Sequence, residues 1–260
     1  MFFWNCWVRN RYRLLAYLAS GCALVLLGTL PVTMAMRHGH WVWVHPSTLT
    51  DARAVWDMGV EHVALVTIFL LLVAGADLGS LGVGESAAQK EYDFLLTRPR
   101  RRRHFVWAAY GAGLAQLGLM TLVPLVVAMM TLYALTSHLC PGQLGPLSLG
   151  ALVASLLVFS SAFALSVATG SSRTGFELAF CLIFGYYAFW EVLWSVGIWL
   201  IRFYGYHPRY GRMFYGPYAG HAYDWLLNGD QVNYLYLLVM LGVSAGLAFV
   251  AQIGFERKDV

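Results

Sequence analysis

Charged side chains are scarce in this chain of 260 residues, since Asp, Glu, Lys and Arg together make up only 12% of it. An ordinary soluble domain carries about 25%, because its surface faces water. Apolar residues make up 59% of the sequence. This balance excludes an ordinary water-soluble globular protein and indicates a chain that places much of its surface in lipid.

Lysine is almost absent, since Lys90 and Lys258 are the only two. A P-loop for ATP requires Gly-Lys-Ser/Thr, because its lysine neutralises the terminal phosphates and its hydroxyl binds magnesium. Lys90 follows Gln89 and Lys258 follows Arg257, so neither lysine fits this motif. We therefore expect that the chain does not hydrolyse ATP by itself and is not an enzyme of that kind.

Paired cysteines are also missing. The four cysteines, Cys6, Cys22, Cys140 and Cys181, show neither a CxxC motif nor the spacing of metal ligands. We interpret them as small apolar residues without a redox role. The net charge of +4 does not indicate a nucleic-acid partner, because the basic residues lie where membrane topology would place them.

Long apolar runs are abundant. A bilayer core about 30 Å thick needs roughly 20 apolar residues in a helix that satisfies its own backbone hydrogen bonds. Six stretches meet this requirement, so the sequence predicts a single all-α, polytopic membrane domain over residues 1–260. The expected spans cover residues 14–36, 60–81, 105–135, 147–169, 176–200 and 234–255. The third span is longer than one crossing requires, so we expect it to tilt, kink or project beyond the membrane.

Lysine and arginine in the connecting segments predict the orientation, because cytoplasmic loops carry an excess of them. With the N-terminus in the cytoplasm, the inner segments hold twelve of these residues and the outer segments five. We therefore expect both termini in the cytoplasm. Residues 1–13 mix phenylalanine, tryptophan and arginine, which is typical of a short helix in the inner interface or of a frayed tail with aromatic anchors.

The most informative stretch lies between the second and third spans, at residues 84–98. Its apolar residues recur at i, i+4, i+7 and i+8, which predicts a short amphipathic helix. These residues are Ala88, Tyr92, Leu95 and Leu96. Pro99 ends the helix, because proline disfavours helical conformation in the residue before it. Four arginines, at 100–103, then lie at the cytoplasmic headgroups.

This stretch resembles the coupling helix of type-2 ABC exporter permeases, which reads approximately E-R-E...T-L-E-F-L-L-T-x-P-x-x-R-R. Glu85 matches the first acidic position, Asp93 the glutamate before Phe94, and Pro99 the proline. Lys90 stands where a glycine is common, which is a departure from the pattern. The chain also ends Gly-Phe-Glu-Arg-Lys-Asp-Val, similar to the F-x-R-R-D-hydrophobic close of many such permeases.

The resemblance implies that the chain is a permease subunit of an ABC exporter in a prokaryotic plasma membrane. Two such subunits, identical or homologous, would pair and dock onto a dimer of a separate cytoplasmic ATPase. That partner would bind ATP and magnesium, and this chain would bind no cofactor. The residues that the resemblance places against the ATPase are Glu85, Glu91, Tyr92, Asp93, Phe94, Leu95, Leu96 and Pro99.

Ionisable residues within expected spans are functional candidates, because a charge in lipid is costly. Asp77 lies near the inner end of the second span, Glu177 at the start of the fifth, and Glu191 well inside the fifth. Asp77 and Glu177 are close enough to span ends to reach the interface instead. Glu191 is either a residue of the substrate pathway or an interhelical hydrogen-bond partner.

Three further sequence patterns carry weaker predictions. Residues 201–233 are rich in tyrosine, which predicts an extracellular aromatic segment at the outer headgroups. Gly242 and Gly246 predict close helix packing through a small-xxx-small face. Methionine and histidine alternate at the outer end of the first span, a pattern that can hold Cu(I) but often arises without a metal, so no metal site is expected. The residues concerned are Met34, Met36, His38 and His40.

Two other classes of function remain open. An intramembrane enzyme would use Ser244 with a histidine, or Glu191 on a lipid substrate. However, the GxSxG motif around Ser244 lies in an apolar helix rather than a strand-to-helix turn, and none of the eight histidines lies deep in an expected span. A structural or assembly subunit of a larger membrane complex would need no coupling helix.

Overall fold

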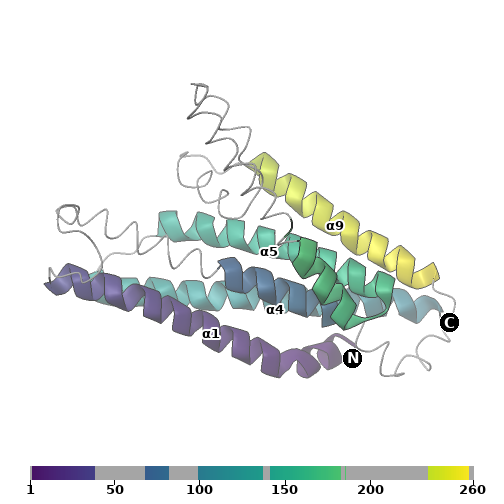
Figure 1. Cartoon of the computed structure of the whole chain (residues 1–260), viewed down its shortest axis with the longest axis horizontal. Helices are drawn as coiled ribbons and strands as arrows, with labels where there is room; N and C mark the ends of the chain where they lie inside the picture. The colour runs from purple at the N-terminus through teal and green to yellow at the C-terminus, as the bar shows by residue number, and fades with distance from the viewer. Residues whose placement is uncertain are drawn as a thin grey trace, which may run out of the picture.

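The computed structural model describes residues 2–38, 68–81, 99–136, 141–182, 185 and 234–257. Every one of these residues except Gly170 and Ser171 lies in an α-helix, which confirms the all-α prediction for the described part. The long helices, shown in Figure 1, are α1 (Phe2–His38), α4 (Pro99–Thr136), α5 (Pro141–Thr169) and α9 (Tyr234–Arg257). Two shorter helices cover Ile68–Leu81 and residues 172–182.

Three of the described helices are long and apolar enough to cross a membrane, as expected of a membrane protein. The qualifying stretches are Arg103–Thr131 in α4, Ser148–Thr169 in α5 and Leu237–Arg257 in α9. They fall in the third, fourth and sixth expected spans. The first, second and fifth expected spans are not among these stretches, so the number of six spans and the orientation of the termini stay predictions.

Helix α1 begins at Phe2 and runs without a break through the rest of the expected interfacial segment, 1–13, and the first span, 14–36. Its 37 residues would extend about 55 Å at 1.5 Å per residue, which exceeds a bilayer core of about 30 Å. Helix α4, with 38 residues, is as long. Both helices are therefore long enough to project beyond the hydrocarbon region.

Consecutive described helices run in alternating directions (Figure 1). Along the helix Ile68–Leu81, Leu70 lies beside Gly21 of α1 and Asp77 beside Arg13, so the two helices are antiparallel. Helices α4 and α5 are also antiparallel, and α9 runs against α4. The start of α1 and the end of α9 consequently lie at the same end of the bundle (Figure 1).

The helix Ile68–Leu81 packs closely against α5 because two of its glycines face that helix. A Cβ atom built on Gly75 would lie 2.7 Å from the backbone oxygen of Ser155, and one built on Gly79 would overlap the backbone oxygen of Phe159. A Gly-x-x-x-Gly pattern of this kind lets two helix backbones approach each other. The two helices therefore form one tightly packed unit.

Helix α5 ends in a tight turn that leads directly into the helix 172–182. Gly170 has a φ of 70°, which favours glycine, and its N–H donates to the carbonyl of Ser166 at 2.9 Å. The hydroxyl of Ser171 then accepts a hydrogen bond from the backbone N–H of Thr174 at 3.3 Å, as an N-cap does. The connection between the fourth and fifth expected spans is this turn.

Helix α4 contains Pro124, and its ring is buried against α1. A Cβ built on Gly21 would lie 3.0 Å from the Cγ atom of Pro124. Proline has no N–H for the backbone hydrogen bond of the preceding turn. The two helices therefore meet closely at a point where α4 lacks one of its own hydrogen bonds.

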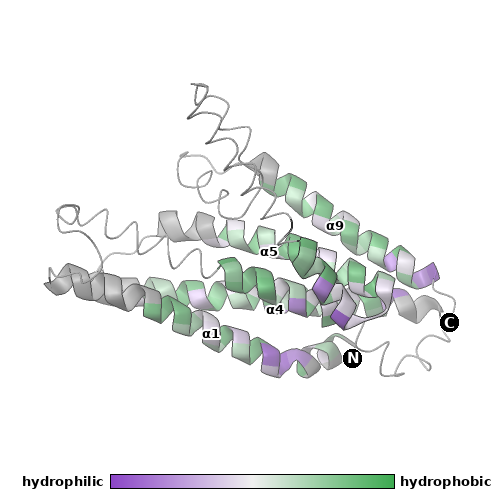
Figure 2. Cartoon of the chain, viewed as in Figure 1, coloured by the Kyte–Doolittle hydropathy of each residue, from purple (hydrophilic) through white to green (hydrophobic). Residues whose placement is uncertain are grey.

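Hydrophobic residues predominate along the described helices (Figure 2), and many of them are exposed on the outside of the bundle while others are buried inside it. The buried share of the apolar stretch is 50% in α5 but only 28% in α9. Exposed apolar residues along α9 include Leu238, Val239, Val243, Phe249 and Val250. A helix that is apolar on its outer face is suited to contact with lipid.

Candidate functional site

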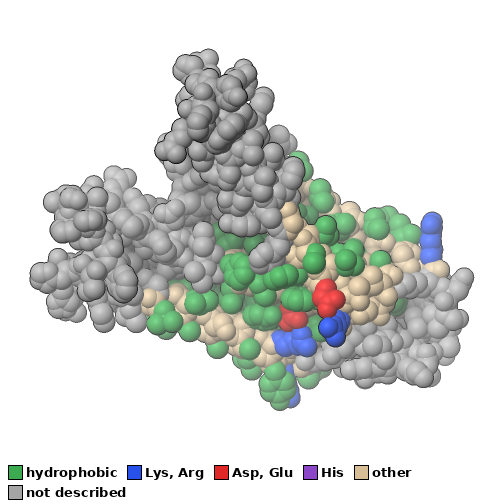
Figure 3. Space-filling view, viewed as in Figure 1, with side chains coloured by type: hydrophobic (Ala, Val, Ile, Leu, Met, Phe, Trp, Pro, Cys, Tyr) green, Lys and Arg blue, Asp and Glu red, His purple; other side chains and the backbone are tan. Residues whose placement is uncertain are grey.

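Ion pairs gather at the end of the bundle where α1 begins and α9 ends. The pairs found among the described residues are Arg13–Asp77, Arg103–Glu256 and Arg173–Glu177. Figure 3 shows acidic and basic side chains side by side on the visible face. Each pair lies close to the end of a helix, where the sequence predicts the cytoplasmic boundary. We take this charged end as the candidate functional site.

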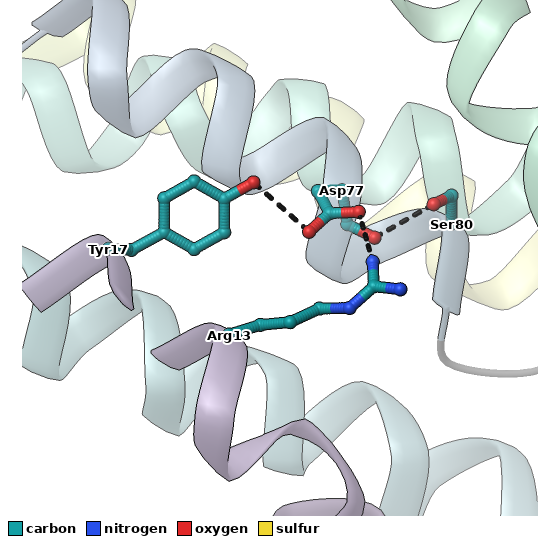
Figure 4. Close-up of polar contacts among 4 residues, drawn as sticks. All are labelled: Arg13, Tyr17, Asp77 and Ser80. Carbon is teal, nitrogen blue, oxygen red and sulfur yellow. Dashed lines mark hydrogen bonds and ion pairs between the residues drawn. The ribbon is translucent and has the colours of Figure 1, made fainter. Parts of the chain in front are cut away.

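Asp77 links the helix Ile68–Leu81 to α1 (Figure 4). Its Oδ1 accepts a hydrogen bond from Nη1 of Arg13 at 2.7 Å, and its Oδ2 accepts one from the hydroxyl of Tyr17 at 3.0 Å. Arg13 and Tyr17 are four residues apart and so lie on one face of α1. The hydroxyl of Ser80 donates to the backbone oxygen of Asp77 at 2.8 Å. The carboxylate thus has a donor for each oxygen.

The burial of the Asp77 side chain explains why it is paired. It is 18% exposed, whereas the Arg13 side chain is 48% exposed. Burying a charged carboxylate without an opposite charge or hydrogen-bond donors is energetically costly. Asp77 is therefore held in an interhelical ion pair, while the guanidinium of Arg13 reaches outward.

A second polar cluster links α4 to α9. Oε1 of Glu256 accepts from Nε of Arg103 at 3.1 Å and from Nε2 of Gln252 at 2.8 Å. Oε1 of Gln252 accepts from Nε1 of Trp107 at 2.8 Å. Because both helices contribute residues four apart, the contacts form two rungs one helical turn apart.

The third ion pair lies within one helix. Nε of Arg173 donates to Oε1 of Glu177 at 2.8 Å, and the two side chains are 88% and 55% exposed. The carboxylate of Glu177 raises the pKa of the Arg173 guanidinium through its hydrogen bond and its charge. Glu177 thus lies at the surface near a helix end. This position fits the expectation that its side chain reaches the membrane interface.

Polar groups also lie between the helices. The hydroxyls of Tyr110 in α4 and Ser160 in α5 are 2.8 Å apart and buried. Gln116 in α4 is fully buried, and its Nε2 donates to the backbone oxygen of Trp7 at a long 3.4 Å. Its Oε1 has no hydrogen-bond partner among the residues that the structure describes. The sequence contained a signal for this buried amide, because Gln116 is a polar residue within an expected apolar span.

Several predicted site residues lie outside the described part of the chain. These are Glu85, Glu91, Tyr92, Asp93, Phe94, Leu95, Leu96, Glu191, His40 and the aromatic segment 201–233. Pro99 is the first residue of α4, the position where proline best fits a helix. Met34, Met36 and His38 lie in α1.

Gly242 and Gly246 lie on the exposed face of α9. A Cβ added at either position meets nothing within 4 Å among the described residues. Ser244, between them, is 1% exposed, and its hydroxyl donates to the backbone oxygen of Met240 at 2.8 Å. The two glycines therefore pack against no described helix, and the GxSxG motif lies inside a regular helix.

The described residues contain no group of three or more His, Cys, Asp or Glu side chains arranged to hold a metal ion. Comparison with protein-family models gives no match, and comparison with curated proteins gives none. The residues that sequence reasoning missed at the charged end are Arg13, Tyr17, Arg103, Gln252 and Glu256. In the sequence, Arg13 and Arg103 contributed only to the count of basic residues that predicts the orientation of the chain.

Proposed function

We propose that this chain is the membrane-spanning permease subunit of an ATP-binding cassette exporter, coupled to a separate cytoplasmic ATPase. The observation that carries the proposal is the pattern of residues 84–103, with acidic residues, a Phe-Leu-Leu-Thr run, a proline and four arginines. The intramembrane-enzyme and assembly-subunit alternatives give this pattern no role.

The arrangement of the helices supports the proposal. Alternating apolar helices suit a multi-pass permease, and their charged ends lie together at the predicted cytoplasmic side. The coupling segment joins a helix that ends at Leu81 to one that begins at Pro99, and both helices pack into the bundle. A protein docked on this segment would therefore act on packed helices and not on a free tail.

The chemistry of the segment fits a groove on the partner ATPase. Tyr92, Phe94, Leu95 and Leu96 would supply apolar anchors, and Glu85, Glu91 and Asp93 would pair with a basic rim. ATP-driven closure of the ATPase dimer would then move the segments of two permeases. In the membrane, the two permeases would form the substrate pathway, with Glu191 as its candidate polar residue.

The decisive experiment is purification of the tagged chain in mild detergent, with identification of co-purifying proteins and an ATPase assay. Leu95→Asp places a charge in the expected apolar anchor, so we expect it to abolish ATPase binding, because an unpaired buried charge is strongly unfavourable. Ser86→Asp is the matched control, since it adds the same charge on the side of the expected helix opposite Leu95.

We expect the wild type and Ser86→Asp to retain a Walker-motif ATPase and Leu95→Asp to insert into the membrane without it. A wild-type preparation free of any ATPase would contradict the proposed function. Equal retention by all three proteins would contradict the assignment of the segment as the docking site.

A further inference from the structure

We propose that the ion pairs Arg13–Asp77 and Arg103–Glu256 transmit movement of the segment 82–98 to the first and last described helices. This inference rests on the proposed function, in which the partner ATPase moves that segment. It assigns four positioning residues, which act through the helices that carry them.

The two pairs flank the segment in the sequence and lie in the helices on either side of it. Asp77 lies four residues before Leu81, and Arg103 lies four residues after Pro99. Four residues of helix extend about 6 Å, or roughly one turn. A displacement of either end of the segment therefore reaches an interhelical ion pair after a single turn of hydrogen-bonded helix.

The pairs reach different helices. Asp77 joins the helix before the segment to α1, and Arg103 joins the helix after it to α9. Each pair has further contacts: Tyr17 donates to Asp77, and Gln252 donates to Glu256. Movement at the two ends of one short segment is thereby linked to two separate long helices.

The chemistry of these links differs from that of the neighbouring helix contacts. Gly75 and Gly79 bring the helix Ile68–Leu81 so close to α5 that the two move as one packed unit. In both ion pairs the arginine is partly exposed, Arg13 at 48% and Arg103 at 64%. Partly exposed charges exchange protein partners for water or lipid headgroups without becoming buried and unpaired. Ion pairs of this kind are suited to link helices that shift relative to one another.

The third ion pair provides a control. Arg173 and Glu177 lie on the same short helix, and their ion pair joins it to no other described helix. Arg173→Gln removes a charge of the same type at the same end of the bundle. It therefore separates a role of the interhelical contacts from a general effect of charge.

The test measures ATP hydrolysis by the complete permease–ATPase complex in lipid vesicles, together with the amount of ATPase that remains bound. The variants are Arg103→Glu, Glu256→Arg, the double charge exchange and Arg173→Gln. Arg103 and Glu256 are exposed enough for the pair to contribute little to stability. A variant that still binds the ATPase but no longer stimulates its ATP hydrolysis would therefore have lost the transmission of movement and not its fold.

We expect each single variant to retain the ATPase but to lose permease-dependent hydrolysis by about fivefold or more, a change of the size found for contacting residues. The double exchange restores it, and Arg173→Gln stays within about twofold of the wild type.

Asp77→Asn supplies a second test, with Tyr110→Phe as a variant that also removes a hydrogen bond between helices but no charge. We expect Asp77→Asn to lower permease-dependent ATP hydrolysis and Tyr110→Phe to leave it unchanged. Unchanged hydrolysis in the Arg103, Glu256 and Asp77 variants, with the ATPase bound, would overturn this inference and leave the permease function standing. Absence of an ATPase from the wild type would overturn both.

Discussion

The hydroxyl of Tyr110 donates its proton to Oγ of Ser160, 2.8 Å away in the interface of α4 and α5. The direction follows from a second contact, because the single proton of Ser160 is donated to the backbone oxygen of Leu156 at 2.8 Å. The ring of Tyr110 is also packed between Phe159 and Phe163, with centroids 5.2 and 5.3 Å away.

We expect Ser160→Ala to destabilise the protein more than Tyr110→Phe. Tyr110→Phe removes one buried hydrogen bond, which costs about 0.5–1.5 kcal/mol, and leaves Ser160 bonded to Leu156. Ser160→Ala leaves the buried hydroxyl of Tyr110 without an acceptor, which costs about 1–3 kcal/mol. Thermal unfolding in mild detergent measures both, and the reverse order would contradict the assigned donor.

Asp77→Asn should weaken the contact between α1 and the helix Ile68–Leu81. It removes the charge that neutralises Arg13. We expect the free energy of unfolding to fall by about 1–2 kcal/mol, because Arg13 is half exposed. Arg173→Gln, in an exposed pair within one helix, should leave the melting temperature nearly unchanged. Equal melting temperatures for Asp77→Asn and the wild type would show that the pair contributes no stability.

Gly79→Ala should lower stability by about 1–3 kcal/mol, because the added methyl group overlaps the backbone of Phe159 and must separate two packed helices. Gly246→Ala is the matched comparison, since it changes the second glycine of the same pattern where the added methyl group meets open space. We expect no loss there. A comparable loss at Gly246 would show that this face of α9 packs against another surface.

A fluorescent reporter fused to the C-terminus should be active in the cytoplasm, and an alkaline phosphatase fused there should be inactive. This follows from the excess of lysine and arginine on the predicted inner side. Replacing the four arginines at 100–103 should leave the orientation unchanged, because the inner segments would still hold more basic residues than the outer ones. An active phosphatase would reverse the proposed topology.

The sequence predicted the helices better than the contacts between them. Apolar length alone located the stretches in α4, α5 and α9, because lipid imposes a minimum length on a helix that crosses it. It divided α1 into an interfacial segment and a span, whereas one helix covers both. A change from polar to apolar residues marks a membrane boundary, but it does not end a helix.

The contacts at the charged end could be predicted only in part. Asp77 was recognised as a candidate because a charge within an apolar run is costly. Its partner Arg13 lies 64 residues away, and a single sequence contains no signal that joins them. The Gly-x-x-x-Gly pattern occurs at both 75–79 and 242–246, and only the position of α5 beside the first one distinguishes them.

Gly21 and Pro124 form a joint constraint on how this sequence can change over evolution. The ring of Pro124 occupies the space that a side chain at position 21 would need. A larger residue at 21 requires Pro124 and Leu70, whose Cδ2 would lie 3.3 Å away, to shift, and loss of the proline removes the tighter of the two contacts. Among related chains, we therefore expect these two positions, more than a hundred residues apart, to be inherited as a pair.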